Sequence, residues 1–301
     1  MHLTSSMSPE SRAGAFVGKI GSVLSRVQVR GKHRLVSALG RSFSSVCPEV
    51  HCFRFKDDGM TIRLTDRIER FMWAGCYESQ LVALLNWALR PGMVFVDAGA
   101  HIGYFATLAA WLVGEQGEVL CFEPDPDCAS RLATNTRNYS WVHLHHAAVR
   151  DEVGEVTFFR SPRADESGWG TIFSATGPRP QIRVRMTTLD ETFTRHSLKR
   201  LDFIKLDIEG AEHRALEGGD RTIARYRPSV FLEVNEVCRG WDNKSPRDII
   251  SFFTDRAYAV RYVPGRKGRI ESMFATPKER HTPPEVTAAL NPILRQSIRW
   301  T

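Results

Sequence analysis

The chain of 301 residues has ordinary globular composition, with 42% hydrophobic and 25% charged residues, and its formal net charge is +7. It holds no apolar run of the roughly 18 residues that a membrane-spanning helix needs, and no signal-peptide core, so we expect neither a transmembrane nor a secreted protein. The six cysteines show no C-x-x-C pair, which indicates a reducing compartment, and we expect a cytoplasmic protein. No nucleic-acid module signature occurs, so we expect no nucleic-acid partner.

The excess of basic charge gathers at the start of the chain. Residues 1–45 contain seven Lys or Arg and a single acid, Glu10. Between residues 13 and 39 apolar residues recur with partly helical spacing, and basic residues stand between them. A basic amphipathic helix of this kind packs on the rest of the chain or lies on an anionic membrane. We expect packing, with at most a weak peripheral membrane contact, and an extension that is partly helical or disordered.

The pattern of residues 46–90 predicts a flank or lid that precedes the main domain. Apolar residues alternate loosely over 50–68, and Asp57-Asp58-Gly59 is a hairpin turn signal, so we expect two short antiparallel strands. A helix is expected over Ser79–Leu89, and Pro91-Gly92 ends it.

The main domain is predicted over residues 91–275 and begins with the most informative stretch of the chain. Val94-Phe95-Val96 is a continuous apolar run, which is typical of a parallel strand buried on both faces. Asp97 ends the run. Gly99 and Gly103 then allow the backbone to turn tightly into the helix that follows.

Strands and helices alternate through the rest of this domain. Further strands are expected at 119–122, 142–145, 201–207 and 229–234, with two short ones at 156–159 and 182–186 beside a long irregular segment. Alternation of this kind predicts an α/β fold with a doubly wound, mostly parallel, seven-stranded sheet. The last two strands, at 259–263 and 270–275, would form an antiparallel hairpin at one edge, and residues 276–301 a tail.

The glycine turn departs from the dinucleotide-binding fingerprint G-x-G-x-x-G. When the fingerprint is aligned on Gly103, Ala100 occupies the position where the backbone must approach a pyrophosphate closely. Asp97 would also repel a pyrophosphate. S-adenosylmethionine fits better because it carries no phosphate. Its amino group suits an acid, and its ribose diol suits Glu123, which ends the next strand and is followed by Pro124.

Several segments, taken in order along the chain, resemble the FkbM family of class I S-adenosylmethionine-dependent methyltransferases. They are Asp97–Phe105, Phe122-Glu123-Pro124, Ala147-Ala148-Val149, Thr188-Leu189-Asp190 and Lys205–Glu212. The resemblance implies a Rossmann-like fold and, usually, O-methylation of a hydroxyl on a sugar, glycolipid or polyketide-type product. It departs at His101, where the family commonly has Asn. A non-catalytic S-adenosylmethionine- or nucleotide-binding module and an NAD(P)-dependent oxidoreductase are the alternatives.

The turn, the strand ends and the resemblance together give a candidate cofactor site. The resemblance places a Tyr-Glu pair before the core, which here is Tyr77-Glu78. The expected cofactor-binding residues are Glu78, Asp97, Gly99, Ala100, His101, Gly103, Tyr104, Glu123, Pro124, Ala147 and Asp207.

Carboxylates at the later strand ends are the candidates for chemistry on the methyl acceptor. A hydroxyl acceptor loses its proton as it attacks, and the candidate bases are Asp207, Glu209 and His213. The acceptor, a small molecule or glycan, is expected to contact Trp169, Glu233, Asn235 and Glu236. Acids on adjacent strand ends can also hold Mg²⁺, but we expect direct substrate contact and no metal.

Overall fold

The structure, a computed structural model, describes residues 12–26, 31–55, 58–163, 165–173, 178–234, 245–264 and 270–280. The chain forms two compact units, one of residues 1–82 with 161–169 and one of residues 83–160 with 170–301. Asn235, Glu236 and most of the expected C-terminal tail lie outside the described residues. The domain boundaries expected from the sequence stay a prediction.

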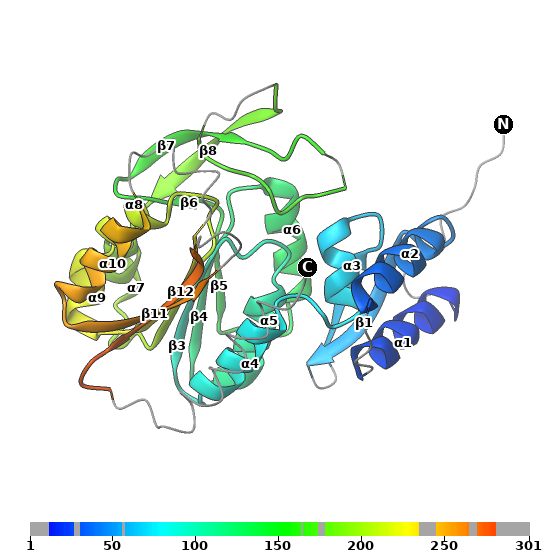
Figure 1. The fold of residues 1–301 in the computed structure, drawn as a ribbon, viewed down its shortest axis with the longest axis horizontal. Helices are drawn as coiled ribbons and strands as arrows, with labels where there is room; N and C mark the ends of the chain where they lie inside the picture. The colour runs from blue at the N-terminus through cyan, green and yellow to red at the C-terminus, as the bar shows by residue number, and fades with distance from the viewer. Residues whose placement is uncertain are drawn as a thin grey trace. The chain divides into compact units, whose positions relative to one another are not determined.

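The first unit consists of three helices and a β-hairpin (Figure 1). Its elements are α1 (Arg12–Arg26), α2 (Lys32–Ser44), β1 (Glu49–Phe55), β2 (Asp58–Arg63) and α3 (Arg67–Trp73). The expected pair of strands forms, with Val50 opposite Ile62 in an antiparallel register. Asp66 caps α3 by accepting hydrogen bonds from the backbone of Ile68 and Glu69 at 2.8 and 3.0 Å.

Helix α1 packs on β1 and α3 through glycines. A Cβ atom on Gly18 would lie 2.4 Å from the carbonyl oxygen of His51, and one on Gly21 would lie 2.3 Å from Nε1 of Trp73. Trp73 is fully buried, and its Nε1 donates a hydrogen bond of 3.0 Å to the carbonyl of Val17. The helix therefore has an inner side that tolerates no larger residue at these positions.

The described residues of the second unit build a seven-stranded sheet in the order β11-β12-β10-β9-β3-β4-β5 (Figure 1). The strands are β3 (Val94–Ala98), β4 (Glu118–Phe122), β5 (Val142–His145), β9 (Phe203–Leu206), β10 (Ser229–Glu233), β11 (Tyr258–Pro264) and β12 (Ile270–Pro277). The first five named are parallel, and β12 is antiparallel to both β10 and β11. The predicted doubly wound sheet with an antiparallel edge hairpin is confirmed.

Helices cover both faces of this sheet (Figure 1). They are α4 (Ser79–Ala88), α5 (Tyr104–Val113), α6 (Pro126–Asn135), α7 (Leu189–His196), α8 (Glu212–Glu217), α9 (Asp220–Tyr226) and α10 (Pro246–Thr254). Strand β3 is buried along its whole length, as its apolar run predicts. Leu189, Ile223 and Phe253 from α7, α9 and α10 share one core with the strands. None of the helices in the described ranges combines the length and hydropathy that crossing a bilayer requires.

A second, three-stranded sheet in this unit has the order β6-β8-β7. Its strands are β6 (Ala148–Val149), β7 (Gly154–Phe159) and β8 (Gln181–Thr187). The last two are the short strands expected beside the irregular segment, and they pair antiparallel with Val156 opposite Val184. The backbone of Thr171 in that segment bonds to Phe159 in both directions, at 2.9 and 2.7 Å.

Candidate active site

The glycine turn follows β3 and passes between the ends of two neighbouring strands. Gly99 has φ +79°, and a Cβ atom there would lie 1.8 Å from the carbonyl oxygen of Asp207, which follows β9. The backbone N–H groups of Gly99 and Ala100 donate to the carbonyl of Phe122 at the end of β4, at 3.0 and 3.1 Å. The turn is therefore bonded to β4 and packed against β9, and only glycine fits at position 99.

His101, the departure from the family pattern, adopts the left-handed conformation with φ 52°. Asn and His are enriched several-fold among the non-glycine residues that do so. The replacement therefore keeps a residue type that tolerates the turn. The backbone N–H of His101 donates a hydrogen bond of 2.8 Å to Oε2 of Glu123.

Glu123 is buried at the end of β4, directly beside the turn. Its Oε1 accepts a hydrogen bond of 2.8 Å from the backbone of Asp125, and its Oε2 accepts the bond from His101. Burial raises the pKa of Glu123 to about 7, although these two backbone bonds lower it. Asp125 in turn caps α6 and pairs with Arg160 at 2.6 Å. Each oxygen of Glu123 accepts one bond here and has room for a second.

Lys205 is a buried cation between the glycine turn and the end of β9. It is 1% exposed, and its Nζ lies 3.2 Å from Oδ1 of Asp97, 3.4 Å from Oδ2 of Asp207 and 3.1 Å from the carbonyl oxygen of Gly99. Asp97 is 0% exposed, and within the described part of the chain its Oδ2 has no hydrogen-bond partner. Burial raises the pKa of Asp97, and Lys205 opposes this rise.

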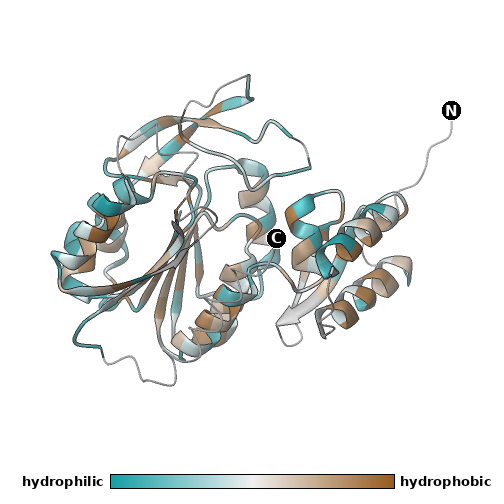
Figure 2. Cartoon of the chain, in the orientation of Figure 1, coloured by the Kyte–Doolittle hydropathy of each residue, from teal (hydrophilic) through white to brown (hydrophobic). Residues whose placement is uncertain are grey.

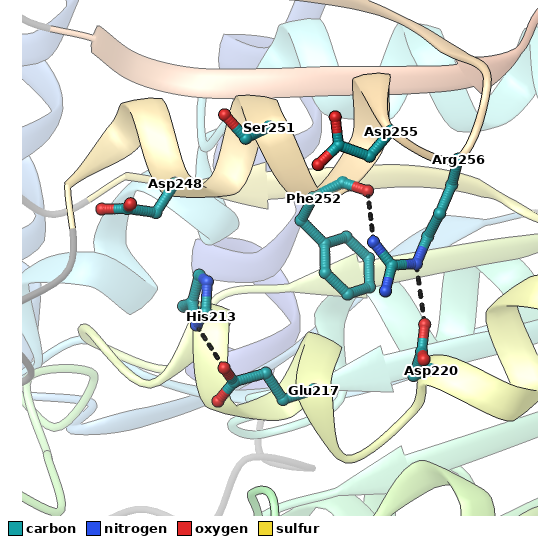
Figure 3. A pocket seen from close by; sticks show the side chains of 8 residues that line it. All are labelled: His213, Glu217, Asp220, Asp248, Ser251, Phe252, Asp255 and Arg256. Carbon is teal, nitrogen blue, oxygen red and sulfur yellow. Dashed lines mark hydrogen bonds and ion pairs between the residues drawn. The ribbon is translucent and has the colours of Figure 1, made fainter.

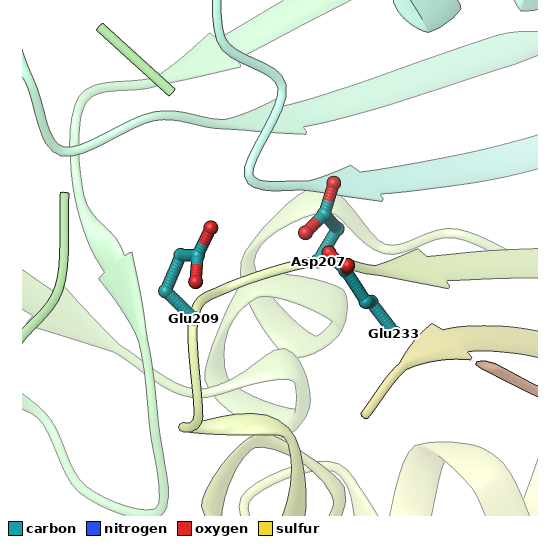
Figure 4. A group of neighbouring side chains, drawn as sticks. All are labelled: Asp207, Glu209 and Glu233. Atoms are coloured by element: carbon teal, nitrogen blue, oxygen red, sulfur yellow. The ribbon is translucent and has the colours of Figure 1, made fainter. Parts of the chain in front are cut away.

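Three carboxylates meet at the ends of β9 and β10 (Figure 4). One oxygen each of Asp207, Glu209 and Glu233 lies within 4.8 Å of the others. Burial raises the pKa of Asp207, but the charge of Lys205 and a hydrogen bond with Glu233 outweigh this, so its pKa lies below the usual value. Asp207 is therefore favoured as an ionised member of this group.

The backbone that carries Glu209 is held in a tight turn. Glu209 has φ 52° and Gly210 has φ 101°. Oε1 of buried Glu212 accepts from the backbone of Ile208 and Gly210 at 3.1 and 3.2 Å, and burial raises the pKa of Glu212 to about 7. Thr171 adds a bond of 3.0 Å from its Oγ1 to the carbonyl of Glu209. Glu212 therefore stabilises the turn that brings Glu209 close to Asp207 and Glu233.

Comparison with known proteins identifies the family. Residues 97–260 match the family described as Methyltransferase FkbM domain. The chain belongs to the FkbM methyltransferase family. The matched region, over half of the chain, runs from the last residues of β3 to β11 and includes the turn, Glu123 and the carboxylates. The predicted family and the class I methyltransferase fold are confirmed.

Two curated relatives of this FkbM-family chain are methyltransferases by name. The 2-O-methyltransferase NoeI of Sinorhizobium fredii is 27% identical over 204 residues, which cover 61% of this chain and 82% of that protein. The hexuronic acid methyltransferase AglP of Haloferax volcanii is 25% identical over 175 residues, which cover 58% of this chain and 68% of that protein. Among solved structures, methyltransferase FkbM from Methylobacillus flagellatus matches with a TM-score of 0.41 and 17% identity, covering 69% of this chain and 52% of that one.

His213, the third candidate base of the FkbM-family chain, lines a different hollow (Figure 3). Its Nδ1 lies 3.5 Å from Oε1 of Glu217, one turn along α8. The hollow has a volume of about 520 Å³ between α8, α9 and α10, and Asp248 and Arg256 also line it. The structure brings Asp207 and Glu209 together with Glu233 and gives His213 these other neighbours. Its role as a base stays a prediction.

The remaining expected residues divide between the two units. Tyr104 is buried at the start of α5, Pro124 follows β4, and Ala147 is buried after β5. Glu78 and Trp169 belong to the first unit, where Trp169 is 46% exposed. Asn235 and Glu236 fall outside the described residues.

Sequence reasoning left one central residue out of the expected site. The sequence does not indicate that Lys205 contacts Asp97, Gly99 and Asp207 at once. A signal was present, because a lysine in an otherwise apolar buried strand requires a counter-charge. Asp97 lies near the end of the neighbouring strand β3, opposite Lys205, and Asp207 directly follows β9.

Proposed function

We propose that this FkbM-family chain transfers a methyl group from S-adenosylmethionine to a hydroxyl group of a sugar, glycolipid or secondary-metabolite acceptor. The names of the relatives, a 2-O-methyltransferase and a hexuronic acid methyltransferase, support the oxygen and the sugar. The observation that carries the proposal is the position of Asp207. Its carboxylate is tied through Lys205 to the glycine turn and lies beside Glu209 and Glu233.

The turn and its neighbours suit S-adenosylmethionine. Gly99 leaves the surface beside Asp207 clear of a side chain. The carboxylate of Glu123 can accept both hydroxyls of a ribose, since each oxygen has a remaining acceptor position. Buried Asp97 offers Oδ2 as an acceptor for the ammonium group. When bound, S-adenosylmethionine would supply a methyl carbon for in-line attack by a nucleophile, with S-adenosylhomocysteine as the leaving group.

The carboxylates suit the task of accepting the proton of the acceptor hydroxyl. Lys205 keeps the pKa of Asp207 low, so Asp207 is ionised at neutral pH and can accept a hydrogen bond from the hydroxyl. Glu209 lies within reach of the same group and is the second candidate base. Glu233 is exposed, which supports its proposed direct contact with the acceptor. Alignment of the hydroxyl by these groups supplies much of the rate in an in-line displacement.

Calorimetry with two variants tests the cofactor assignment. Glu123→Ala removes the proposed ribose contact and should weaken S-adenosylmethionine binding at least about tenfold, as expected for a lost charge-assisted contact. Glu152→Ala, at an exposed glutamate in the turn before β7, is the matched control and should bind as the unchanged protein does. Equal affinities in both variants would refute the ribose assignment. Heat on adding NAD(P), with none from S-adenosylmethionine, would favour the oxidoreductase alternative.

Labelled cofactor tests the reaction itself. The protein is incubated with methyl-labelled S-adenosylmethionine and a cell extract, and labelled products are identified by mass spectrometry. We expect a label on a hydroxyl oxygen. Tight cofactor binding without any S-adenosylhomocysteine would favour a non-catalytic binding module.

None of the five cysteines among the described residues forms a disulfide, which supports action in a reducing compartment such as the cytoplasm.

A further inference from the structure

Exposed apolar side chains concentrate on the first two helices. Seven large apolar residues are exposed in the described residues, and four of them lie between positions 16 and 46. These four are Phe16 at 64% exposure, Val23 at 61%, Leu35 at 44% and Val46 at 60%. Figure 2 shows hydrophobic segments on both α1 and α2. Contiguous apolar surface marks an interaction site, whereas single exposed apolar residues are ordinary, so the arrangement of these residues on each helix is decisive.

Helix α1 has two sides of different chemistry. Its inner side, with Val17 and Gly21, is buried against β1 and α3. Arg12, Phe16, Lys19 and Val23 are all exposed, and their spacing of four, three and four residues places them in one stripe. The outer side of α1 is therefore apolar and positively charged at the same time.

Helix α2 repeats this combination. Val36 and Gly40 are buried, and Gly40 packs on Arg70 of α3. Arg34 and Leu35 are exposed on the other side. Over residues 11–48 the sequence holds seven Lys or Arg and no Asp or Glu. Phe16, Val23 and Leu35 therefore have basic residues as their nearest charged neighbours in the sequence, whereas Val46 lies closer to Glu49 than to Arg41.

We propose that the outer stripe of α1, formed by Arg12, Phe16, Lys19 and Val23, docks on an anionic lipid surface, and exposed Arg34 and Leu35 of α2 carry the same chemistry. Interfacial helices bind by inserting apolar side chains into the headgroup region, while neighbouring cations contact the lipid phosphates. Charge complementarity thus selects an anionic bilayer as the occupant. The outer side of each helix has the chemistry of a helix that lies on a membrane. The inner side of each helix packs on the rest of the chain, as the sequence predicts. The proposal concerns the first unit and does not depend on the proposed methyl transfer.

Co-sedimentation of the full chain with vesicles tests the proposal. One set of vesicles contains phosphatidylcholine and phosphatidylglycerol at about two to one, and the other contains phosphatidylcholine alone. We expect sedimentation with the anionic vesicles only, and a bound fraction that falls as salt is added. The double variant Phe16→Ser/Val23→Ser should lower the apparent affinity about tenfold or more. Val153→Ser, at a valine of similar exposure in the second unit, should leave it unchanged.

A charge pair provides a second, independent readout. Lys19→Gln should weaken binding to anionic vesicles and reduce its salt dependence, whereas Lys199→Gln, at an exposed lysine of the second unit, should do neither. Circular dichroism and S-adenosylmethionine calorimetry check that each variant is folded.

Several outcomes would overturn the proposal. They are wild-type protein that stays in the supernatant, equal binding to both kinds of vesicle, and Phe16→Ser/Val23→Ser binding like Val153→Ser. Retention of RNA without retention of anionic vesicles, or a dimer that Phe16→Ser/Val23→Ser dissociates, would assign the surface to another occupant.

Discussion

Replacing Lys205 with Met tests the buried charge network at the centre of the site. The change keeps an unbranched side chain of similar length and removes a cation whose Nζ lies 3.2 Å from Asp97 and 3.4 Å from Asp207. At an effective dielectric constant of about 20, each contact corresponds to about 5 kcal/mol of Coulomb energy, and the cost of burying the lysine offsets much of this. Because Asp97 is left buried without its counter-charge, we expect a loss of about 3–5 kcal/mol in the free energy of unfolding.

Urea unfolding followed by circular dichroism measures this loss. The double variant Lys205→Met/Asp97→Asn removes the stranded charge and should recover part of the stability, which gives a coupling energy between the two residues. Lys199→Met, at an exposed lysine, is the matched control and should change stability by less than about 0.5 kcal/mol. A loss below about 1 kcal/mol for Lys205→Met would refute the reasoning, because the pair would then contribute no more than a surface ion pair.

The pH dependence of the Lys205→Met defect provides a further check. Burial already raises the pKa of Asp97 in the folded state, and loss of Lys205 raises it further. A group whose pKa is higher in the folded than in the unfolded state stabilises the fold fully below the unfolded pKa, and this stabilisation is lost as the pH rises through the folded pKa. The deficit of the variant relative to wild type should therefore grow over the range in which the pH rises above the folded-state pKa of Asp97 in the wild type. A deficit that shrinks over this range would contradict the assignment.

Three further predictions concern the cofactor turn and the carboxylates. Gly99→Ala should abolish S-adenosylmethionine binding in calorimetry, because its Cβ atom would lie 1.8 Å from the carbonyl oxygen of Asp207. Gly92→Ala is the control and should bind normally, since Gly92 also has φ +79° but its Cβ atom would meet no atom nearer than 4.0 Å. With the pKa of Glu123 raised to about 7 by burial, its ionised fraction rises as the pH increases, so the affinity for S-adenosylmethionine should be about tenfold higher at about pH 8 than at about pH 6. Glu123→Gln should lack this part of the dependence, and a pH profile shared by both proteins would refute it. Methyl transfer should survive EDTA, since Lys205 supplies the positive charge beside Asp207; a loss of activity that Mg²⁺ restores would show that Asp207, Glu209 and Glu233 hold a metal.

The sheet was predictable because its strands carry strong local signals. Val94-Phe95-Val96 is apolar at every position, and the structure buries β3 completely. The helix expected to begin at Tyr104 runs to Val113, bounded by Gly103 and Gly114. The place of β12 between β10 and β11 was not predicted, because strand order depends on contacts between residues far apart in the sequence.

The individual residues of the site could be predicted from the sequence, but the contacts between them could not. The sequence indicates that Asp97, Glu123 and Asp207 each end a strand, because an acid follows an apolar run. It does not indicate that Glu123 binds the backbone of His101 or that Asp207 shares a hydrogen bond with Glu233. Those contacts depend on side-chain directions that the left-handed turn at His101 and the sheet twist set together.

Lys205 makes the donor and acceptor sides of the site one physical unit. Its Nζ contacts the carbonyl of Gly99, where the cofactor is proposed to lie, and the carboxylate of Asp207, which is proposed to accept the proton. A movement of the glycine turn therefore changes the position of Lys205 relative to Asp207, and ionisation of Asp207 changes the attraction that Lys205 exerts on the turn. Glu233 contacts Asp207 and is exposed, so it is the member of the network that can differ without disturbing the cofactor turn. Acceptor choice should consequently respond to changes at Glu233, while changes at Lys205 should affect methyl transfer to every acceptor.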